Sequence, residues 1–530
     1  MQMPTLREVV SDPYYVSGAT VLLGGLIVAL RLVRSRRKMK RLPPGPRGYP
    51  VIGSLLEAPK LEDEPWRVYD EWKKKYGDII YFEVLGQPFL ILGSLEVAQD
   101  LFERRSAIYS SRPPLPMARD LVGWDFSFSF SPYGQHWRKD RRAFHEHFHS
   151  GVVSHYQPAQ LKETRIFLRL LLNTPENFLY HSRFTFAATI MRVAYGITVE
   201  PDSDSVYVTA AESALNTLSQ VAIPGTFLVD IIPALKYVPS WFPGAGFKKQ
   251  AAQWRKELDK FIELPFAHVK RLMKAGNAVP CLVTKLLDSL PDESSPTRDE
   301  EENRAKYVPA NAYAAGSDTT VSTVQSFFLA MAMNPHVVKK AQAELNAVIG
   351  RNRLPDFSDR PSLPYINAIA KEAMRWKLVT NLGLAHMVLE DDEYNGYFIP
   401  KGTFVMGNSW GILHDPTIFK DPEEFIPERF LREDGQLDPA ARDPASAAFG
   451  FGRRICPGRH FSDQNLFITI ASVLASFDIQ APLDENGNLV KLEPKYYGGM
   501  LSHPVPFECR ITPRSAMIPK LIQDSLDTLE

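Results

Sequence analysis

Cysteine is scarce in this 530-residue chain, which contains only Cys281, Cys456 and Cys509. Three thiols cannot form the disulfide framework of a secreted protein, so most of the chain is expected in a reducing compartment. An excess of either charge is also absent, because 61 Lys and Arg residues balance 61 Asp and Glu residues. This balance argues against a general electrostatic role on nucleic acid, since such domains are usually strongly basic.

Charged residues are absent from Pro13 to Leu30, a run of about the minimum length for a bilayer-spanning helix. Seven basic residues follow between Arg31 and Arg41. Because positive charge stays on the cytosolic side, residues 1–41 are predicted to form a single-pass anchor with the rest of the chain in the cytosol. A cleaved signal peptide is the alternative, but the run ends in a basic cluster and has no small-residue cleavage site.

Residues 42–50 contain four prolines, which exclude a helix or a central strand. They predict a stiff extended hinge between the anchor and the body, although a ligand for a proline-recognition domain would have a similar composition. Residues 51–530 show no internal repeat and no second linker of this kind. They are therefore predicted to form one mainly α-helical domain with a minor β portion.

Hydrophobic periodicity places the main elements of this domain. The predictions are a strand pair over 79–92 turning around Gly86, Gln87 and Pro88, helices within 155–275 and 335–380, a charged loop over 288–306, and short strands with turns over 398–403.

One buried helix is predicted between Pro309 and Pro335, where Asp318 is the only charged residue. A lone carboxylate in such a helix is costly unless it is used or satisfied. Gly316 weakens a helix, and the hydroxyl of Thr319 can bond back to a carbonyl one turn earlier. These residues indicate a local distortion beside a small cavity. A helix–helix contact that requires small residues remains the alternative.

The segment from Phe449 to Gly458 surrounds Cys456 with arginines and glycines and precedes a helical pattern. The free N–H groups and the dipole of a helix N-terminus stabilise a thiolate, and so do neighbouring arginines. A thiolate is the form of cysteine that binds a metal. The glycines would let the backbone pass close to a large flat group.

Two further patterns are ambiguous on their own. Glu372 and Arg375 are one helical turn apart, which usually means a weak surface ion pair. His145-Glu146-His147-Phe148-His149 matches the H-E-x-x-H motif of zinc peptidases, in which both histidines share one helix face. The strongly basic segment before it disfavours a zinc site, so the end of a solvated basic helix is the preferred interpretation.

In chain order these segments resemble the cytochrome P450 family of heme-thiolate enzymes, over essentially the whole chain. The motifs that carry the resemblance are the anchor with its Pro43-Pro44-Gly45-Pro46 hinge, Trp137-x-x-x-Arg141, Ala315-Gly316-Ser317-Asp318-Thr319-Thr320, Glu372-x-x-Arg375, Pro427-Glu428-Arg429-Phe430, and Phe449-x-x-Gly452-x-Arg454-x-Cys456-x-Gly458.

The resemblance implies the cytochrome P450 fold and a heme b whose iron takes Cys456 as its axial thiolate ligand, which favours O–O cleavage. It further implies a role for each remaining motif residue. The heme would be contacted from the cysteine side by Phe449, Gly452 and Gly458, and its other face by Ala315 and Gly316. Its propionates would be bound by Trp137, Arg141, Arg454 and His386. The catalytic residues that deliver protons would be Asp318 and Thr319, and a structural ion network would be formed by Glu372, Arg375 and Arg429.

The implied activity is a monooxygenase that inserts one oxygen atom of O₂ into a small lipophilic substrate. Electrons would come from an NADPH-dependent cytochrome P450 reductase in the endoplasmic reticulum membrane, with Arg138, Lys139 and Arg142 as a cationic docking face. The segments 390–403 and 414–416 resemble fungal microsomal enzymes of secondary metabolism, which suggests a terpenoid substrate.

Other functions remain open at this stage. They are an aromatic or alkaloid hydroxylase of the same family, a heme-thiolate isomerase or dehydratase, which the pair Asp318-Thr319 disfavours, a zinc peptidase and a heme sensor. Leu378, Asn381 and Ala385 stand where relatives often have prolines, so pocket shape does not transfer from the family.

Position along the chain predicts which stretches line the substrate pocket. They are 111–130, 221–247, the helix face near Tyr313, Ala314 and Ser317, 379–384, and 497–501, with 221–224 and 238–243 as an entry lip that could dip into the bilayer.

Overall fold

The computed structural model describes residues 41–60, 63–201, 206–223 and 225–529. The predicted anchor, with its charge-free run from Pro13 to Leu30 and its basic cluster as far as Lys40, lies outside these residues. Within the described ranges no helix combines the length and the apolar character needed to cross a membrane.

The proline-rich segment lies extended against the sheet. Residues 41–48 form neither helix nor strand. The amide of Tyr81 donates to the carbonyl of Pro44 at 2.9 Å, and that of Phe398 donates to the carbonyl of Arg41 at 2.7 Å. A Cβ on Gly45 would lie 1.8 Å from the Tyr81 carbonyl oxygen, so this close approach requires glycine.

The largest sheet has four strands in the order β1-β2-β6-β3. The predicted strand pair is confirmed as β1 (Ile79–Val84) and β2 (Gln87–Leu92), which are antiparallel. The predicted turn is misplaced, because Gln87 and Pro88 belong to β2 and the turn residues are Leu85 and Gly86, both with positive φ. β2 pairs in parallel with β6 (Phe404–Gly407), and β6 pairs antiparallel with β3 (His386–Met387).

Three two-stranded sheets complete the β portion. Their antiparallel pairs are β4 (Asp392–Tyr394) with β5 (Tyr397–Ile399), β7 (Phe477–Gln480) with β10 (Arg510–Pro513), and β8 (Tyr496–Tyr497) with β9 (His503–Pro504).

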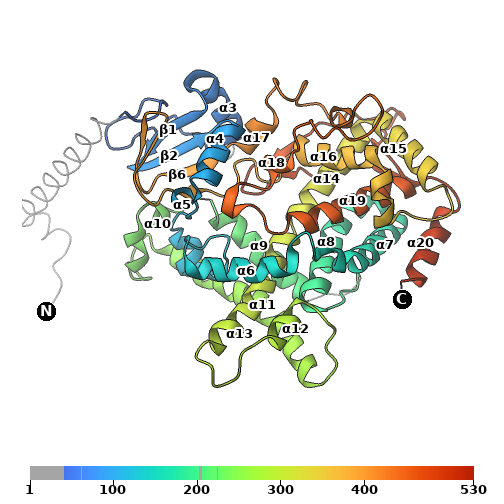
Figure 1. The fold of residues 1–530 in the computed structure, drawn as a ribbon, viewed down its shortest axis with the longest axis horizontal. Coiled ribbons are helices and arrows are strands. Elements are labelled where there is room, and N and C mark those ends of the chain that lie inside the picture. The colour runs from blue at the N-terminus through green and yellow to red at the C-terminus, as the bar shows by residue number, and fades with distance from the viewer. Residues whose placement is uncertain (1–40, 61–62, 202–205, 224, 530) are drawn as a thin grey trace, which may run out of the picture.

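Helices make up most of the described chain, and in the view of Figure 1 most of them lie to the right of the sheet region and below it. This confirms a mainly α-helical fold with a minor β portion. The helices are α3 (Pro65–Tyr76), α4 (Leu95–Gln99), α5 (Ser106–Tyr109), α6 (Gln135–Phe148), α7 (Gln157–Asn173), α8 (Phe178–Tyr195), α9 (Val206–Val221), α10 (Leu228–Ile231), α11 (Gly246–Lys274), α12 (Leu282–Asp288), α13 (Arg298–Gly316), α14 (Thr319–Met333), α15 (Pro335–Val348), α16 (Pro364–Trp376), α17 (Ser409–Leu413), α18 (Ala445–Ala448), α19 (Arg459–Ser476) and α20 (Ile518–Asp527).

The buried helix is longer than predicted and is broken in the middle. It begins at Arg298 instead of Pro309, so the predicted loop over 288–306 is wrong for its second half. It is interrupted at Ser317 and Asp318, between α13 and α14. The distortion that the sequence indicated is confirmed: the Thr319 hydroxyl donates to the carbonyl of Ala315 at 2.8 Å. Tyr313 belongs to one core cluster and Val321 to another, so the break falls between the two clusters.

Candidate active site

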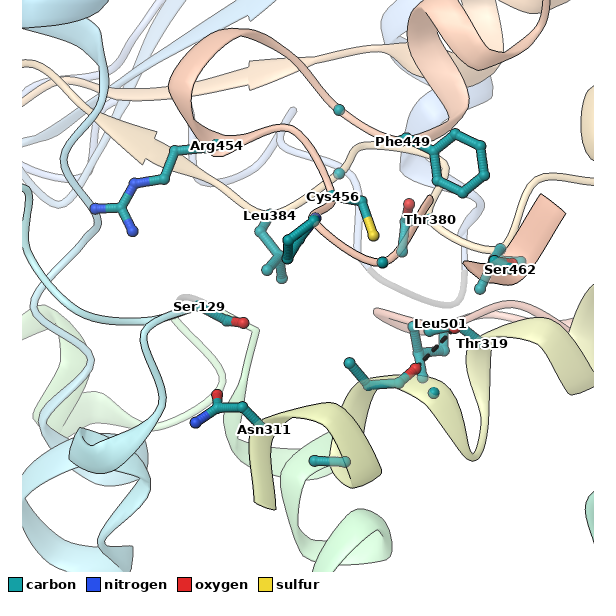
Figure 2. Close-up of a pocket in the computed structure, with 18 of the residues that line it drawn as sticks. Ser129, Asn311, Thr319, Thr380, Leu384, Phe449, Arg454, Cys456, Ser462 and Leu501 are labelled. Carbon is teal, nitrogen blue, oxygen red and sulfur yellow. Dashed lines mark hydrogen bonds between the residues drawn. The ribbon is translucent and has the colours of Figure 1, made fainter. Parts of the chain in front are cut away.

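A cavity of about 320 Å³ separates the loop that carries Cys456 from the broken helix (Figure 2). The Cys456 sulfur points from the loop toward the side of the cavity formed by Thr319. Ala315 is exposed, whereas residues 310–313 of the same helix are buried, and Ala315 lines this cavity. The cavity thus runs between a thiol on one wall and a hydroxyl with an open alanine on the other.

The Cys456 loop is held in place by backbone hydrogen bonds and by the start of α19. The Cys456 amide donates to the Phe449 carbonyl at 2.8 Å, and α19 begins three residues after the cysteine. Burial raises the pKa of the Cys456 thiol, while the backbone N–H of Gly458 and the cations of Arg141 and Arg459 act in the opposite direction. A buried thiolate here therefore needs further positive charge, which a metal cation supplies.

Glycine is required at some positions of this loop and not at others. A Cβ on Gly452 would lie 2.0 Å from the Phe102 carbonyl oxygen, and Gly452 has a φ of +55°. The sequence interpretation attributed this glycine to a flat group, but the protein backbone itself requires it. A Cβ on Gly458 would meet no protein atom within 4 Å. Gly316 in α13 is likewise required by a protein contact, because its Cβ would lie 2.7 Å from Ile190 of α8.

Three arginines, the buried Arg112 and Arg454 and the half-buried Arg141, gather at one end of the cavity without a carboxylate partner among the described residues. Arg454 donates to the carbonyls of Ser110, Phe128 and Ser131 at 2.7–3.0 Å. Burial lowers the pKa of Arg454 to about 8, and the nearby cations of Arg112 and Arg141 add to this effect.

Arg112 and Arg141 are in the same situation. Arg112 donates to three carbonyls, and burial lowers its pKa to about 9. Burial lowers the pKa of Arg141 to about 10. Because guanidinium groups stay protonated in proteins, these depressed pKa values indicate uncompensated positive charge that favours an anionic ligand.

The remaining predicted propionate ligands lie in the same cluster. His386 on β3 bonds the Tyr109 carbonyl through Nδ1 at 2.7 Å, and burial, with Arg112 and Arg454 nearby, lowers its pKa well below the usual range. The Trp137 ring lies 4.3 Å from the Arg454 guanidinium carbon. Both residues line the cavity. A neutral His386 donates or accepts hydrogen bonds without adding to the local positive charge.

Sequence reasoning missed Arg112 as a member of this cluster. It placed the residue only within a stretch expected to line the substrate pocket. No short motif surrounds Arg112, and its role depends on contacts with residues 384 and 385, which are remote in sequence. The available signal was an arginine beside two prolines at the edge of a strongly apolar stretch.

The predicted proton-delivery residues lie at the helix break. The Asp318 carboxylate accepts a hydrogen bond from Arg183 of α8 at 2.8 Å and lies 3.3 Å from Nε2 of His503 on β9. Burial favours the protonated form, but His503 and Arg183 outweigh it and lower the pKa of Asp318. Thr319 faces the cavity, whereas Asp318 is held as a carboxylate by these two partners.

Glu372, Arg375 and Arg429 come together in a buried network. Arg375 donates to both Glu372 oxygens at 2.6 and 2.9 Å, and both side chains are fully buried. Arg429 Nε and the amide of Ile426 also donate to Glu372. The weak surface ion pair that the local pattern usually indicates is therefore not what the structure contains.

The H-E-x-x-H segment lies at the end of α6. The rings of His145 and His149 are 5.3 Å apart, and their side chains lie on the same face of the helix end. In the described part of the chain, no group of three or more His, Cys, Asp or Glu residues is arranged to hold a metal ion.

The predicted pocket stretches are only partly correct. Trp124, Phe128 and Phe130 line the cavity, as do residues 379, 380 and 382–384 and the end of 497–501. None of the described residues of 221–247 lines it; Leu215, Leu218 and Ser219 of α9 line the cavity in their place. In α13, Tyr313 packs into the core and Asn311 takes a cavity position.

The fold and this site define a mainly helical protein with a cysteine-ligated cofactor pocket. Residues 43–510 match the Cytochrome P450 family, so the chain belongs to that family. It is 48% identical to cytochrome P450 monooxygenase COX2 from Coprinopsis cinerea over 95% of each chain. It is 43% identical to COX1 from the same fungus, over 95% of this chain and 98% of the relative. It is also 37% identical to tryptamine 4-monooxygenase from Psilocybe cyanescens, over 95% and 98% respectively.

The protein is therefore a heme-thiolate monooxygenase, with Cys456 as the axial thiolate ligand of the heme iron. The residues of the cavity fit this group. A thiol and an exposed alanine line the same space, which suits a flat ring, and three arginines without a carboxylate partner in the described chain suit two propionates. When bound, the heme supplies the oxygen chemistry, and the chain supplies binding, orientation and protons.

Proposed function

We propose that the protein is a membrane-anchored monooxygenase of secondary metabolism that hydroxylates a small lipophilic substrate, with terpenoids as the first class to test. The observation that carries this proposal is the cavity wall facing Cys456, which is formed mainly by apolar side chains. The reaction is R–H + O₂ + two electrons + two protons → R–OH + water. Apolar walls favour a hydrocarbon skeleton by burying its surface.

The roles of the remaining site residues follow from their contacts. Arg112, Arg141 and Arg454 bind the two propionates by charge-assisted hydrogen bonds, with Trp137 and His386 alongside. The Thr319 hydroxyl lies at the cavity wall. Because it donates its own proton to the Ala315 carbonyl, its oxygen can still accept a hydrogen bond from a group in the cavity. Asp318 connects this hydroxyl region to Arg183, whose side chain is 45% exposed to solvent. Protons can therefore enter through the Arg183–Asp318 pair.

Membrane attachment is supported by the charge pattern of residues 1–41 and by exposed apolar side chains on the described body. Trp241 is 78% exposed and Tyr237 77%, and Leu228 and Phe242 are also exposed. Their region around α10 lies toward the same edge of Figure 1 as β1, against which the hinge packs. Large exposed apolar groups of this kind mark contact with a membrane or a partner. Alkaline carbonate extraction of microsomes tests the anchor, and release of the protein would contradict it.

The reductase is proposed to dock on α6, next to the Cys456 loop. Arg141 of α6 donates to the Ile455 carbonyl, so this helix contacts the cysteine loop directly. Arg138 and Arg142 are exposed and form no ion pair within the described chain. Lys139 is different from the expectation, because it already pairs with Glu300 at 2.9 Å. Docking should therefore depend on Arg138 and Arg142 more than on Lys139.

The relative named tryptamine 4-monooxygenase favours a second candidate, an aromatic or alkaloid hydroxylase. The two candidates differ in the substrate charge. Among the described residues, Asp318 is the only carboxylate that lines the cavity, and Arg183 and His503 already engage it. An ammonium substrate would lack a free counter-charge in the cavity, which favours the terpenoid proposal.

The test uses the purified full-length protein with a reductase. A strongly red-shifted Soret band after reduction and CO addition first establishes the heme-thiolate state. A panel of terpenoids and tryptamine is then compared by product formation and NADPH use. Hydroxylated terpenoid products are expected. Product from tryptamine alone would support the second candidate and refute the first.

A further inference from the structure

A small polar patch interrupts the apolar wall of the cavity. Asn311 of α13 and Ser127, which directly follows the short helical turn Trp124–Phe126, both line the cavity. The Ser127 hydroxyl donates to Oδ1 of Asn311 at 2.7 Å. Figure 2 shows the Asn311 amide directed toward the segment that carries Ser129, whose side chain also lines the cavity. Asn311 is only 5% exposed, so its amide is held within the wall.

The hydrogen-bonding capacity of this patch is not used up by the protein. Nδ2 of Asn311 donates to the Tyr307 carbonyl at 2.8 Å, which leaves its second N–H. Trp124, which lines the same cavity and is 1% exposed, has a buried indole N–H with no partner in the described chain. Buried donors without partners are rare and costly. The Trp124 indole is one such donor, and together with the second N–H of Asn311 on the same cavity it points to a ligand that accepts hydrogen bonds.

We propose that the Asn311–Ser127 pair and the Trp124 indole bind an oxygen atom of a neutral substrate, so that the natural substrate is an already oxygenated terpenoid and not a bare hydrocarbon. This inference rests on the function proposed above. An earlier oxidation or hydration of the hydrocarbon skeleton must then supply the substrate. Asn311 acts as a specificity-determining residue.

The alternative charge states of the substrate fit this patch less well. A carboxylate would require a cation, and the buried arginines of the cavity are the ones assigned to the propionates. An ammonium would face an amide, a hydroxyl and an indole, and no free carboxylate lines the described cavity. A carbonyl or hydroxyl oxygen satisfies the donors without adding charge.

The test compares ligand pairs that differ only in the oxygen. The sesquiterpene hydrocarbon valencene and its ketone nootkatone, with further alcohol and hydrocarbon pairs, are titrated into the full-length holoenzyme, and the heme spin-state change reports binding. A ketone is better hydrated than its parent hydrocarbon, so a pocket without a partner for the oxygen would bind it more weakly. The wild-type protein is expected to bind the oxygenated member about tenfold more tightly, as expected for a hydrogen bond to buried donors.

Two variants of one residue supply the controls. Asn311→Leu should remove the preference for the oxygenated ligand and leave binding of the hydrocarbon unchanged or tighter. Asn311→Asp has the same size and replaces the free donor by a carboxylate. It should weaken binding of the ketone and strengthen binding of tryptamine, which would then have a counter-charge. The unchanged CO spectrum of each variant shows that the heme site has folded.

Three results would overturn the inference. They are equal binding of both pair members by the wild type, an equal loss of both in Asn311→Leu, and tight tryptamine binding by the wild type. Turnover of hydrocarbons without any preference for oxygenated ligands would refute only the proposed oxygen-binding patch and leave the monooxygenase proposal standing. Binding of no terpenoid at all would refute the proposed substrate class and the inference with it.

Discussion

Replacing Glu372 by glutamine removes the carboxylate that two arginines share in the buried network. Both oxygens of Glu372 accept from Arg375, and one also accepts from Arg429 Nε at 3.1 Å. Glutamine has nearly the same volume, so no cavity forms. Its NH₂ group, however, faces guanidinium donors where an acceptor stood, and both arginines lose their counter-charge inside the protein.

The magnitude follows from burial. Removing one partner of a buried ion pair leaves an uncompensated charge and costs about 3–5 kcal/mol. Total stabilities of proteins are about 5–15 kcal/mol, so this loss is a large fraction of the whole. The adjacent residue provides the control. Lys371 pairs with Asp443 at the surface, and removal of such an exposed pair costs about 0–1 kcal/mol.

The assay is urea unfolding of the full-length holoenzyme, followed by tryptophan fluorescence and by the Soret band. Glu372→Gln should lower the apparent midpoint strongly and reduce the heme content of the purified protein. Lys371→Met should leave both close to wild type. If the two variants shifted the midpoint by the same small amount, the reasoning about buried uncompensated charge would be wrong.

Three further predictions concern the cavity and the docking face. Gly452→Ala should destabilise the apoprotein, because its Cβ would overlap the Phe102 carbonyl, whereas Gly458→Ala should not; thermal unfolding of both apoproteins checks this, and equal effects would contradict it. Thr319→Ala should keep heme and substrate binding but release more of the consumed NADPH as hydrogen peroxide, which a peroxide assay measures; coupling at the wild-type level would exclude its role in proton delivery. Arg142→Glu should lower reductase-supported turnover several-fold at low salt and leave peroxide-supported turnover unchanged; an equal loss in both would argue against a docking role.

Local chemistry explains which parts of the site were predictable. Cys456 stood out because glycines, arginines and a following helix act on it within a few residues of sequence. The back-bonding of Thr319 was predictable for the same reason, since its acceptor is Ala315, one turn earlier. In both cases the relevant contacts are made by neighbours in the chain.

Residues that act through remote contacts could not be identified in this way. Arg112 meets carbonyls of residues 384 and 385, and the partners of Asp318 are Arg183 and His503. The Glu372–Arg375 pattern is typical of a surface pair. Its burial becomes evident only from the hydrogen bonds that Arg429 and the amide of Ile426, both remote in sequence, donate to Glu372. The resemblance to a family supplied this network, and spacing alone would not have done so.

The start of the broken helix shows a different limit. Pro309 was read as its N-terminal boundary, because proline removes a hydrogen bond from a helix interior. The structure places Pro309 inside α13, where it is buried. The helix continues through it because α13 packs on both α8 and α11, so tertiary contacts outweigh the local preference.

The spacing along this helix also bears on the position of oxidation. Asn311 and Thr319 are eight residues apart on either side of the helix break, a separation of about 12 Å if the helical rise continued through it. A substrate whose oxygen is bound at Asn311 would therefore present its opposite end to the Thr319 side of the cavity. Hydroxylation is expected several bonds away from the existing oxygen, and NMR of the products formed from nootkatone would locate the new hydroxyl. A new hydroxyl on a carbon next to the ketone would show that the substrate binds in the reverse direction and that Asn311 does not anchor it.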